Sequence, residues 1–359
     1  MPKRRPRQNN LTDAYLDGEL DGQTADELGG PAEKYGRRSK HAEDAKTVKT
    51  ADLYETKRLV RVQAMPLGQV VQVYSLFSDV ASPEGRHLCV VRKTLRKVQE
   101  SAIVVGDRVR FEPTGATAVD PEADDGRTLP EGVIEHVEPR KTVLMRANAF
   151  DDKTPDPIVA NAGRFLIVAS LLNPWPRWGL VDRMLIAARS GGLEPVVVLN
   201  KVDLDEDGAL AESRRVLDHY RDALGVRCVE TSAESGAGLD TLRGLLDGQE
   251  TVLAGHSGVG KSSLISAAVP GLDLRVSHVS DAHAKGRHTT TSARRFPLPK
   301  GHFRGGAVID TPGVKVFGLW DVTPENLLER HYPDVKAGDA PPWRIESYER
   351  VLESVTPTY

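Results

Sequence analysis

The chain has 359 residues, of which 39% are hydrophobic and 28% charged, and its formal net charge is −3. This composition is typical of a globular protein long enough for two or three domains, and the net charge favours neither nucleic acid nor membrane as a partner of the whole chain. The two cysteines, Cys89 and Cys228, are far apart in sequence and form no CxxC pair, which argues against a disulfide framework and a cysteine zinc cluster. No run approaches the roughly 18 apolar residues of a membrane span, and no apolar region follows the basic N-terminus as in a secretory signal. We therefore expect a cytoplasmic protein with no membrane partner.

The first segment, residues 1–58, is rich in charged, polar and glycine residues and poor in large apolar ones. Such a segment cannot bury enough surface to offset the entropy of ordering, so we predict a disordered tail. Its opening basic cluster, within residues 3–7, is compatible with RNA contact and equally with a solvated tail.

The next segment, residues 59–142, has short runs typical of β-strands, separated by glycine, proline and acidic turns. The runs lie at residues 68–74, 87–91, 109–111 and 132–137. This spacing predicts a small β-barrel. Basic residues cluster at 92–97 and 140–141, as in an oligonucleotide-binding (OB) fold, although an SH3-like barrel with solvated lysines fits the pattern as well.

Strand and helix patterns alternate through residues 143–320. Apolar strand runs occupy residues 164–171, 195–199, 226–229, 251–254 and 307–309, and helical spacing occupies 180–189 and 209–224. The alternation predicts an α/β domain with a mostly parallel sheet covered on both faces. Ligands of such sheets bind beyond the carboxyl ends of the strands, where all the motifs below are expected.

A phosphate-binding loop follows one of these strands and opens a helix. Its sequence fits GxxxxGK[ST], in which glycines let backbone amides wrap the phosphates and the lysine reaches the β- and γ-phosphates. We assign nucleotide binding to the whole loop and the next serine: Gly255, His256, Ser257, Gly258, Val259, Gly260, Lys261, Ser262 and Ser263. Lys261 is also a predicted catalytic residue, and the Ser262 hydroxyl a predicted Mg²⁺ ligand.

A second phosphate-side motif, DTPG at residues 310–313, ends the strand at 307–309. Asp310 suits the role of holding Mg²⁺, and the Gly313 amide that of sensing the γ-phosphate.

Guanine specificity is predicted by NKVD at residues 200–203 and TSA at 231–233, each after a strand. A carboxylate at Asp203 accepts hydrogen bonds from guanine N1–H and its 2-amino group, a donor pair that adenine lacks. The backbone of the second motif would contact the guanine carbonyl. The predicted base-binding residues are Asn200, Lys201, Val202, Asp203, Thr231, Ser232 and Ala233.

A switch loop is expected between the two phosphate-side motifs, where residues 286–291 read GRHTTT. Thr290 is the predicted Mg²⁺-binding and catalytic threonine, with Thr289 second. A mobile polar loop without a fixed role is the alternative.

The order of these motifs is diagnostic of the class. Conventional GTPases run from the phosphate loop through the switch threonine and DxxG to NKxD and SA. Here NKVD at 200 and TSA at 231 precede the phosphate loop at 255, the threonines at 289–291 and DTPG at 310. Permutation preserves a sheet when the original chain ends are exposed and close together. The sequence thus predicts a circularly permuted P-loop GTPase that binds GTP with Mg²⁺.

This order, together with the segments GHSGVGKSSL, GRHTTT and DTPG, resembles the ribosome-small-subunit-dependent GTPase family (RsgA, also called YjeQ). The resemblance covers roughly residues 65–330, including 95–97, 105–107 and 137–140 in the barrel. It implies an OB domain that contacts 16S rRNA, a role late in 30S subunit maturation, and GTP hydrolysis that drives release from the subunit.

Position 314 is a valine, where many GTPases place a water-orienting glutamine, and the family also has an apolar residue there. Another group must then organise the attacking water. His288 in the switch loop is the predicted catalytic candidate, and a surface histidine without that role is the alternative.

The C-terminal segment, residues 321–359, departs from the family, whose members carry a Cys/His zinc module there. This segment contains no cysteine, and His331 alone cannot supply the four ligands of a structural zinc site. We therefore predict no zinc and a short helical segment, with Ile345, Tyr348, Leu352 and Val355 along one helix face.

Two other functional readings compete with a ribosome-dependent GTP hydrolase. One is a nucleotide-controlled interaction protein that hydrolyses GTP slowly and binds a non-ribosomal protein. The other, a P-loop ATPase or kinase, is disfavoured by residues 200–203. Nothing in the sequence requires more than a monomer.

Overall fold

The computed structural model describes residues 60–92, 95, 102–123, 125–146, 156–272, 274, 293–311, 319 and 321–356. Contacts divide the chain into Met1–Leu59 and Val60–Tyr359, and the structure below is that of the second unit. The predicted disordered tail, residues 1–58, lies outside the described residues.

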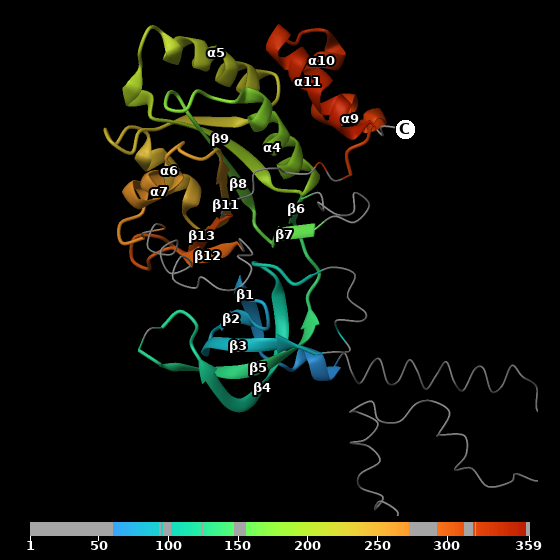
Figure 1. The fold of residues 1–359 in the computed structure, drawn as a ribbon, viewed down its shortest axis with the longest axis vertical. Helices are drawn as coiled ribbons and strands as arrows, with labels where there is room; N and C mark the ends of the chain where they lie inside the picture. Colours follow the sequence, from blue (N-terminus) through green and yellow to red (C-terminus); the bar gives the residue numbers. More distant parts are fainter. Residues whose placement is uncertain are drawn as a thin grey trace, which may run out of the picture. The chain divides into compact units, whose positions relative to one another are not determined.

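Five strands form the predicted barrel, and all their pairings are antiparallel except β3–β5 (Figure 1). They are β1 (Leu67–Val73), β2 (Ser78–Ser82), β3 (Gly85–Val91), β4 (Arg108–Val119) and β5 (Thr128–Val137). They pair in the cyclic order β1-β2-β3-β5-β4, and the β1–β4 pairing completes the circle, as a closed barrel requires. Alternating side chains fill the interior, including Val70, Val80, Val109, Phe111 and Ile134. Strand β2 was missed because its serines and aspartate give no apolar run.

One predicted basic loop of this barrel has a structural partner. Arg140 donates two hydrogen bonds to the fully buried Asp107, from Nε to Oδ1 at 2.7 Å and from Nη2 to Oδ2 at 2.8 Å. A paired arginine of this kind anchors the strand ends and is not free to contact RNA. Most of the other cluster, residues 92–97, lies outside the described part of the chain.

The strands that follow the barrel in the sequence form a mostly parallel sheet in the order β10-β9-β8-β11-β13-β12. Its strands are β8 (Arg164–Ser170), β9 (Glu194–Asn200), β10 (Arg227–Glu230), β11 (Gln249–Gly255), β12 (Arg294–Pro297) and β13 (Gly306–Asp310). Only the β12–β13 pair among them is antiparallel. A short hairpin of β6 (Val143–Arg146) and β7 (Asp156–Ala160) precedes the sheet. The parallel sheet was predicted, whereas β12 and the hairpin were not.

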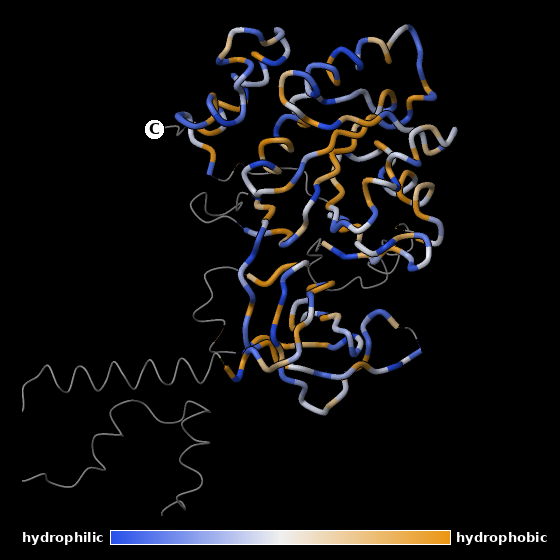
Figure 2. The backbone as a smooth tube through the Cα atoms, turned by 180° about the vertical axis from the view of Figure 1, so that it is seen from behind, coloured by the Kyte–Doolittle hydropathy of each residue, from blue (hydrophilic) through white to orange (hydrophobic). Residues whose placement is uncertain are grey.

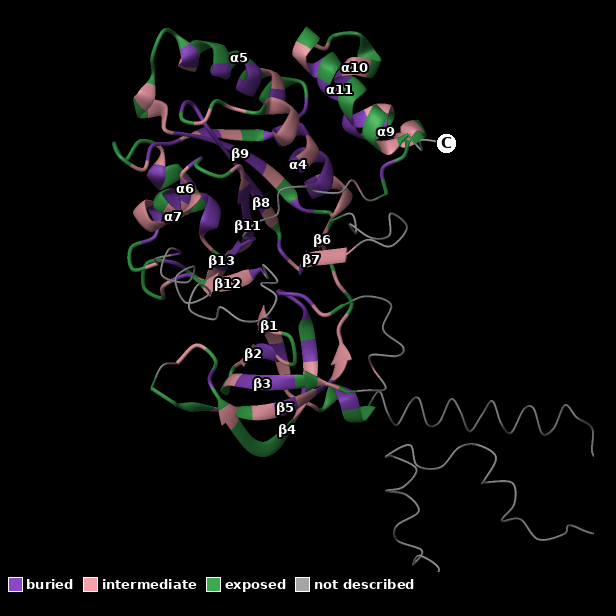
Figure 3. Cartoon of the chain, in the orientation of Figure 1, coloured by how far each residue is buried: buried purple, intermediate pink, exposed green. Residues whose placement is uncertain are grey.

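Alternation along the central strands sends side chains to two cores. Phe165, Ile167 and Ala169 pack with α4 (Trp178–Ser190) and α5 (Ala209–Asp222). Leu166 and Val168 pack with α6 (Leu239–Leu246) and α7 (Lys261–Ala268). The strands are accordingly hydrophobic in Figure 2 and largely buried in Figure 3. Both faces are covered, so the polar motifs must lie at strand ends.

The C-terminal segment is helical, as predicted, and forms α9 (Pro324–His331), α10 (Pro333–Ala337) and α11 (Pro342–Val355). The face of α11 differs from the prediction, because Ile345 is 41% exposed whereas Arg344, Ser347 and Val351 are buried. Tyr348, Leu352 and Val355 do pack on an apolar cluster that includes Ile186 of α4.

Arg344 fixes these helices to the GTPase sheet layer. Its guanidinium lies 2.6 Å from Asp182 of α4, donates to Asp334 of α10 at 3.0 Å, and stacks over the Tyr332 ring at 3.9 Å from its centroid. Burial alone would lower the pKa of Arg344, but the anionic Asp182 and Asp334 outweigh it and the pKa is raised. The cation therefore stays charged while only 2% exposed.

Candidate nucleotide site

The phosphate loop joins the end of β11 to the start of α7. Gly255, Gly258 and Gly260 have φ values of 153°, 84° and 88°, which side chains other than glycine rarely adopt. Space is also restricted, since a Cβ on Gly260 would lie 2.7 Å from Asn200 Nδ2. Backbone conformation and packing together explain why glycine occupies these positions.

Lys261 stands at the first residue of α7 and folds back over the loop. Its ammonium donates to Gly255 O at 2.9 Å and His256 O at 3.1 Å. Burial lowers the pKa of Lys261, and the negative charge of Asp310 opposes that shift. This coupling places a cation and an anion at the same sheet edge, as phosphate and metal binding require.

The predicted metal ligands are only partly described. Asp310 ends β13 and is 5% exposed, and Ser262 lies in the first turn of α7. Carboxylate and hydroxyl oxygens suit Mg²⁺, so these two residues fit the ion. The third ligand, Thr290, lies outside the described residues, as do His288, Thr289, Gly313 and Val314.

Asn200 and Lys201 connect the base-binding motifs to the phosphate loop. Asn200 Nδ2 donates to Val259 O at 3.0 Å, and its Oδ1 accepts from Thr231 Oγ1 at 3.3 Å. Lys201 has φ of 62° and donates to Gly258 O at 2.7 Å and to Asn173 O. These two side chains therefore join the NKVD motif to the phosphate loop, although the bonded residues are 59 and 57 positions apart in the sequence.

Asp203 lies beyond them in the short 3-10 helix η3 (Val202–Leu204), with its side chain exposed. Val202 N donates to Thr231 O at 3.2 Å, which brings the two base motifs together. Ser232 Oγ accepts from Glu234 N and Ser235 N at 3.1 and 2.9 Å and so shapes the turn that contains Ala233. The arrangement leaves the Asp203 carboxylate available to a base.

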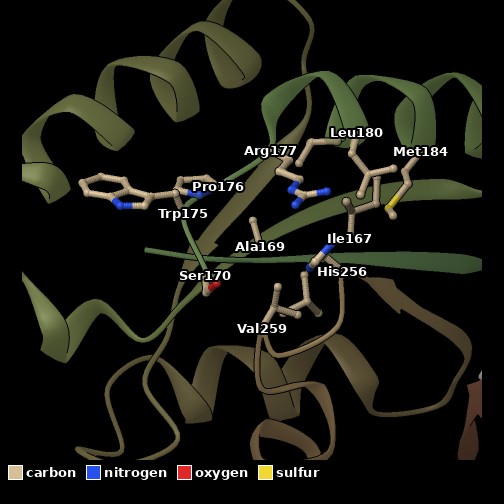
Figure 4. A pocket seen from close by; sticks show the side chains of 13 residues that line it. Ile167, Ala169, Ser170, Trp175, Pro176, Arg177, Leu180, Met184, His256 and Val259 are labelled. Carbon is tan, nitrogen blue, oxygen red and sulfur yellow. The ribbon is translucent and has the colours of Figure 1, made fainter. Parts of the chain in front are cut away.

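Sequence reasoning missed Arg177, in the loop between β8 and α4. Figure 4 shows its guanidinium directed toward His256 in a pocket that the phosphate loop helps to line. Val259, Leu180 and Met184 line the same pocket. The available signal was position, since residue 177 follows the carboxyl end of a strand in the same sheet.

The residues that the structure describes contain neither a candidate membrane span nor a candidate metal cluster. No helix there is long and apolar enough to cross a membrane. In the same residues, no group of three or more His, Cys, Asp or Glu side chains is arranged to hold a metal ion.

Four motifs at the carboxyl ends of one sheet, in the order base sites then phosphate loop, define a circularly permuted P-loop GTPase. The family model described as RsgA GTPase matches residues 137–320. The small ribosomal subunit biogenesis GTPase RsgA of Dickeya dadantii (strain 3937) is 33% identical over 347 residues, covering 89% of this chain and 90% of the relative. Its namesake from Serratia proteamaculans (strain 568) is 34% identical over 320 residues, covering 80% and 84%. The chain belongs to the RsgA GTPase family and is a GTP-binding, GTP-hydrolysing enzyme.

Solved structures agree with the permuted fold. The crystal structure of YjeQ from Thermotoga maritima matches with a TM-score of 0.59 and 29% identity, over 82% of this chain and 99% of that one. YloQ, described as a circularly permuted GTPase, matches with a TM-score of 0.55 over 83% and 98%. At 19% identity the second match concerns the fold alone.

Proposed function

We propose that this GTPase binds the small ribosomal subunit, assists late 30S maturation, and is released when GTP is hydrolysed. The observation that carries the proposal is the joining of the NKVD and phosphate-loop motifs through Asn200 and Lys201. This joining forms a guanine-nucleotide site. The relatives that share the sequence are named small ribosomal subunit biogenesis GTPases. The protein would act as a cytoplasmic monomer.

In the proposed site, Lys261 and the loop amides hold the GTP phosphates, and Ser262 and Asp310 hold Mg²⁺ with Thr290. Mg²⁺ would neutralise charge on the β- and γ-phosphates. Gly313 would report the γ-phosphate, Asp203 would bind guanine, and residues 231–233 would border the base. The five-stranded barrel would contact 16S rRNA.

His288 is proposed to organise the attacking water, because a valine follows Gly313. Replacing His288 with Ala should lower stimulated kcat by about 10²-fold or more while the Kd for GTP is unchanged. Single-turnover hydrolysis and equilibrium GTP binding separate these quantities. Unchanged turnover would remove His288 from the mechanism.

The proposed function is tested by GTP turnover of the purified full-length protein with and without 30S subunits. Controls are 50S subunits in place of 30S, and ATP in place of GTP. Large stimulation by 30S alone supports the proposal. GTP binding without such stimulation would sink the ribosomal assignment and favour a different partner.

A further inference from the structure

A groove lies between the start of α4 and α11. It encloses about 520 Å³ and is open to solvent. One wall consists of Arg177, Trp178, Gly179, Leu180 and Arg183, and the other of Trp343, Ser347, Arg350 and Val351. Three arginines and two tryptophans thus line a groove that has no acidic residue in its lining.

The aromatic walls are held in place from beneath. Trp178 and Trp343 each meet the buried Tyr220 ring edge-on, with centroids 6.1 and 5.6 Å away. The Tyr220 hydroxyl donates to Asp182 at 2.8 Å, and Asp182 is paired with Arg344. Both tryptophans remain half-buried, so each is oriented by the core while part of its ring borders the groove.

The positive charge in the groove is weakly compensated. Arg350 is 64% exposed and lies 3.9 Å from Glu346, which is 67% exposed, so this pair contributes little. Its guanidinium lies against Gly179, where a Cβ would be 3.8 Å from Nη2. Arg183 bonds the neutral Ser354 hydroxyl, and Arg177 is exposed with its guanidinium toward His256 (Figure 4). No acidic residue lies in the first turn of α4.

We propose that this groove binds a single strand of RNA, with bases against the tryptophans and phosphates on the arginines. The inference rests on the proposed function and adds to it a contact site outside the barrel. Sequence-tolerant binding of single strands uses aromatic side chains on which bases stack, beside a positively charged groove that follows the phosphates. Three arginines line the same groove, and this number favours a strand with several phosphates over one isolated phosphate.

The same geometry couples the RNA strand to the nucleotide site. Arg177 and Leu180 line both this groove and the pocket that contains His256. A strand that draws Arg177 toward its phosphates changes the charge beside His256. The C-terminal helices therefore complete an RNA site without a metal-binding module.

The test uses the full-length protein and a fluorescein-labelled single-stranded RNA of about 12 nucleotides. The charge-reversal variant R177E/R350E should bind at least about tenfold more weakly, with a salt slope reduced by about 2. The matched control R221E/R330E reverses two exposed arginines on α5 and α9 and should bind like the wild type. Crosslinking with 4-thiouridine RNA should label peptides that contain Trp178 or Trp343.

Two results would overturn the inference: equal RNA affinity of both double variants, or crosslinks confined to residues 60–142. If R177E/R350E loses 30S-stimulated hydrolysis while its RNA affinity is unchanged, the groove binds a protein and the RNA assignment is wrong. Wild-type stimulation by 30S is measured in parallel. If it is present while R177E/R350E behaves normally throughout, this inference fails and the proposed function stands; if it is absent, the proposed function fails.

Discussion

The nucleotide site and the C-terminal helices each hold together segments that are distant in the sequence, but they do so through different interactions. At the nucleotide site, Asn200 and Lys201 bond backbone carbonyls of a glycine-rich loop at 3.0 and 2.7 Å. In the C-terminal segment, Arg344 is held between two buried carboxylates, those of Asp182 and Asp334. The first region depends on backbone geometry, and the second on a buried charge balance. Removing one group should therefore damage function in the first and stability in the second.

The largest expected effect follows removal of the buried cation. Replacing Arg344 with Met leaves Asp182 and Asp334 buried without the arginine they share, although Asp182 keeps the Tyr220 hydroxyl and Asp334 keeps His219. The loss of this cation should lower the free energy of unfolding by about 3–5 kcal/mol. Urea unfolding followed by circular dichroism measures the change. GTP affinity at a temperature where the variant is folded should stay within about twofold, because Arg344 bonds none of the phosphate-loop residues.

A triple variant, R344M/D182N/D334N, provides the control for that prediction. It removes the orphaned charges together with the cation, so it should be less destabilised than R344M alone. Equal destabilisation of the two variants would show that the lost packing of the arginine stem, and not the buried charges, decides stability.

The second effect concerns base recognition by Asp203. Replacing Asp203 with Asn exchanges one carboxylate oxygen, a hydrogen-bond acceptor, for an NH₂ group, which is a donor. That donor would face a donor of guanine, so GTP binding should weaken by about 100-fold. The same amide can donate to the C2 carbonyl of xanthine, so XTP should bind the variant better than GTP. Fluorescence titration of both nucleotides measures the ratio of the XTP affinity to the GTP affinity.

Asp207, exposed in the same loop with φ of 52°, supplies the control D207N, which should leave this ratio unchanged. An unaltered ratio in D203N would remove this carboxylate from base recognition.

The contrast also explains how far the sequence could be interpreted. Residues 200–203, 231–233 and 255–262 are short motifs whose types follow from the chemistry of phosphates and guanine, and the alternation of strands and helices placed them at one edge. Arg344 gave no such signal, because a charged residue in an amphipathic helix is expected at the surface, and Ile345 was expected to share the buried face. Arg177 was missed for a related reason, since it matches no motif and acquires its setting from α4 and α11 only in the folded chain.

The smallest expected effect tests the charge balance of the C-terminal segment by pH. His331, in α9, is 4% exposed and neither ring nitrogen has a hydrogen-bond partner among the described residues. Burial, together with Arg330, Arg189 and Arg344, lowers the pKa of His331 to about 4, while Asp321 opposes the shift. Because the folded pKa lies below the unfolded value of about 6.5, the unfolded chain takes up the proton first as pH falls. The contribution of His331 to stability is fully present above pH about 6.5 and is lost between about 6.5 and 4, amounting to about 2 kcal/mol at pH 5.

Urea unfolding of the wild type and His331→Phe between pH 8 and 5 measures this contribution. The phenylalanine ring fills similar space without a titrating nitrogen, so the variant should lose less stability on acidification, and the two curves should diverge by about 2 kcal/mol at pH 5. His302→Phe, at an exposed position, controls for the loss of a histidine elsewhere in the domain. Parallel curves for wild type and His331→Phe would mean that His331 gains a proton or a partner in the folded protein. The cationic surroundings of α9 would then not govern its titration.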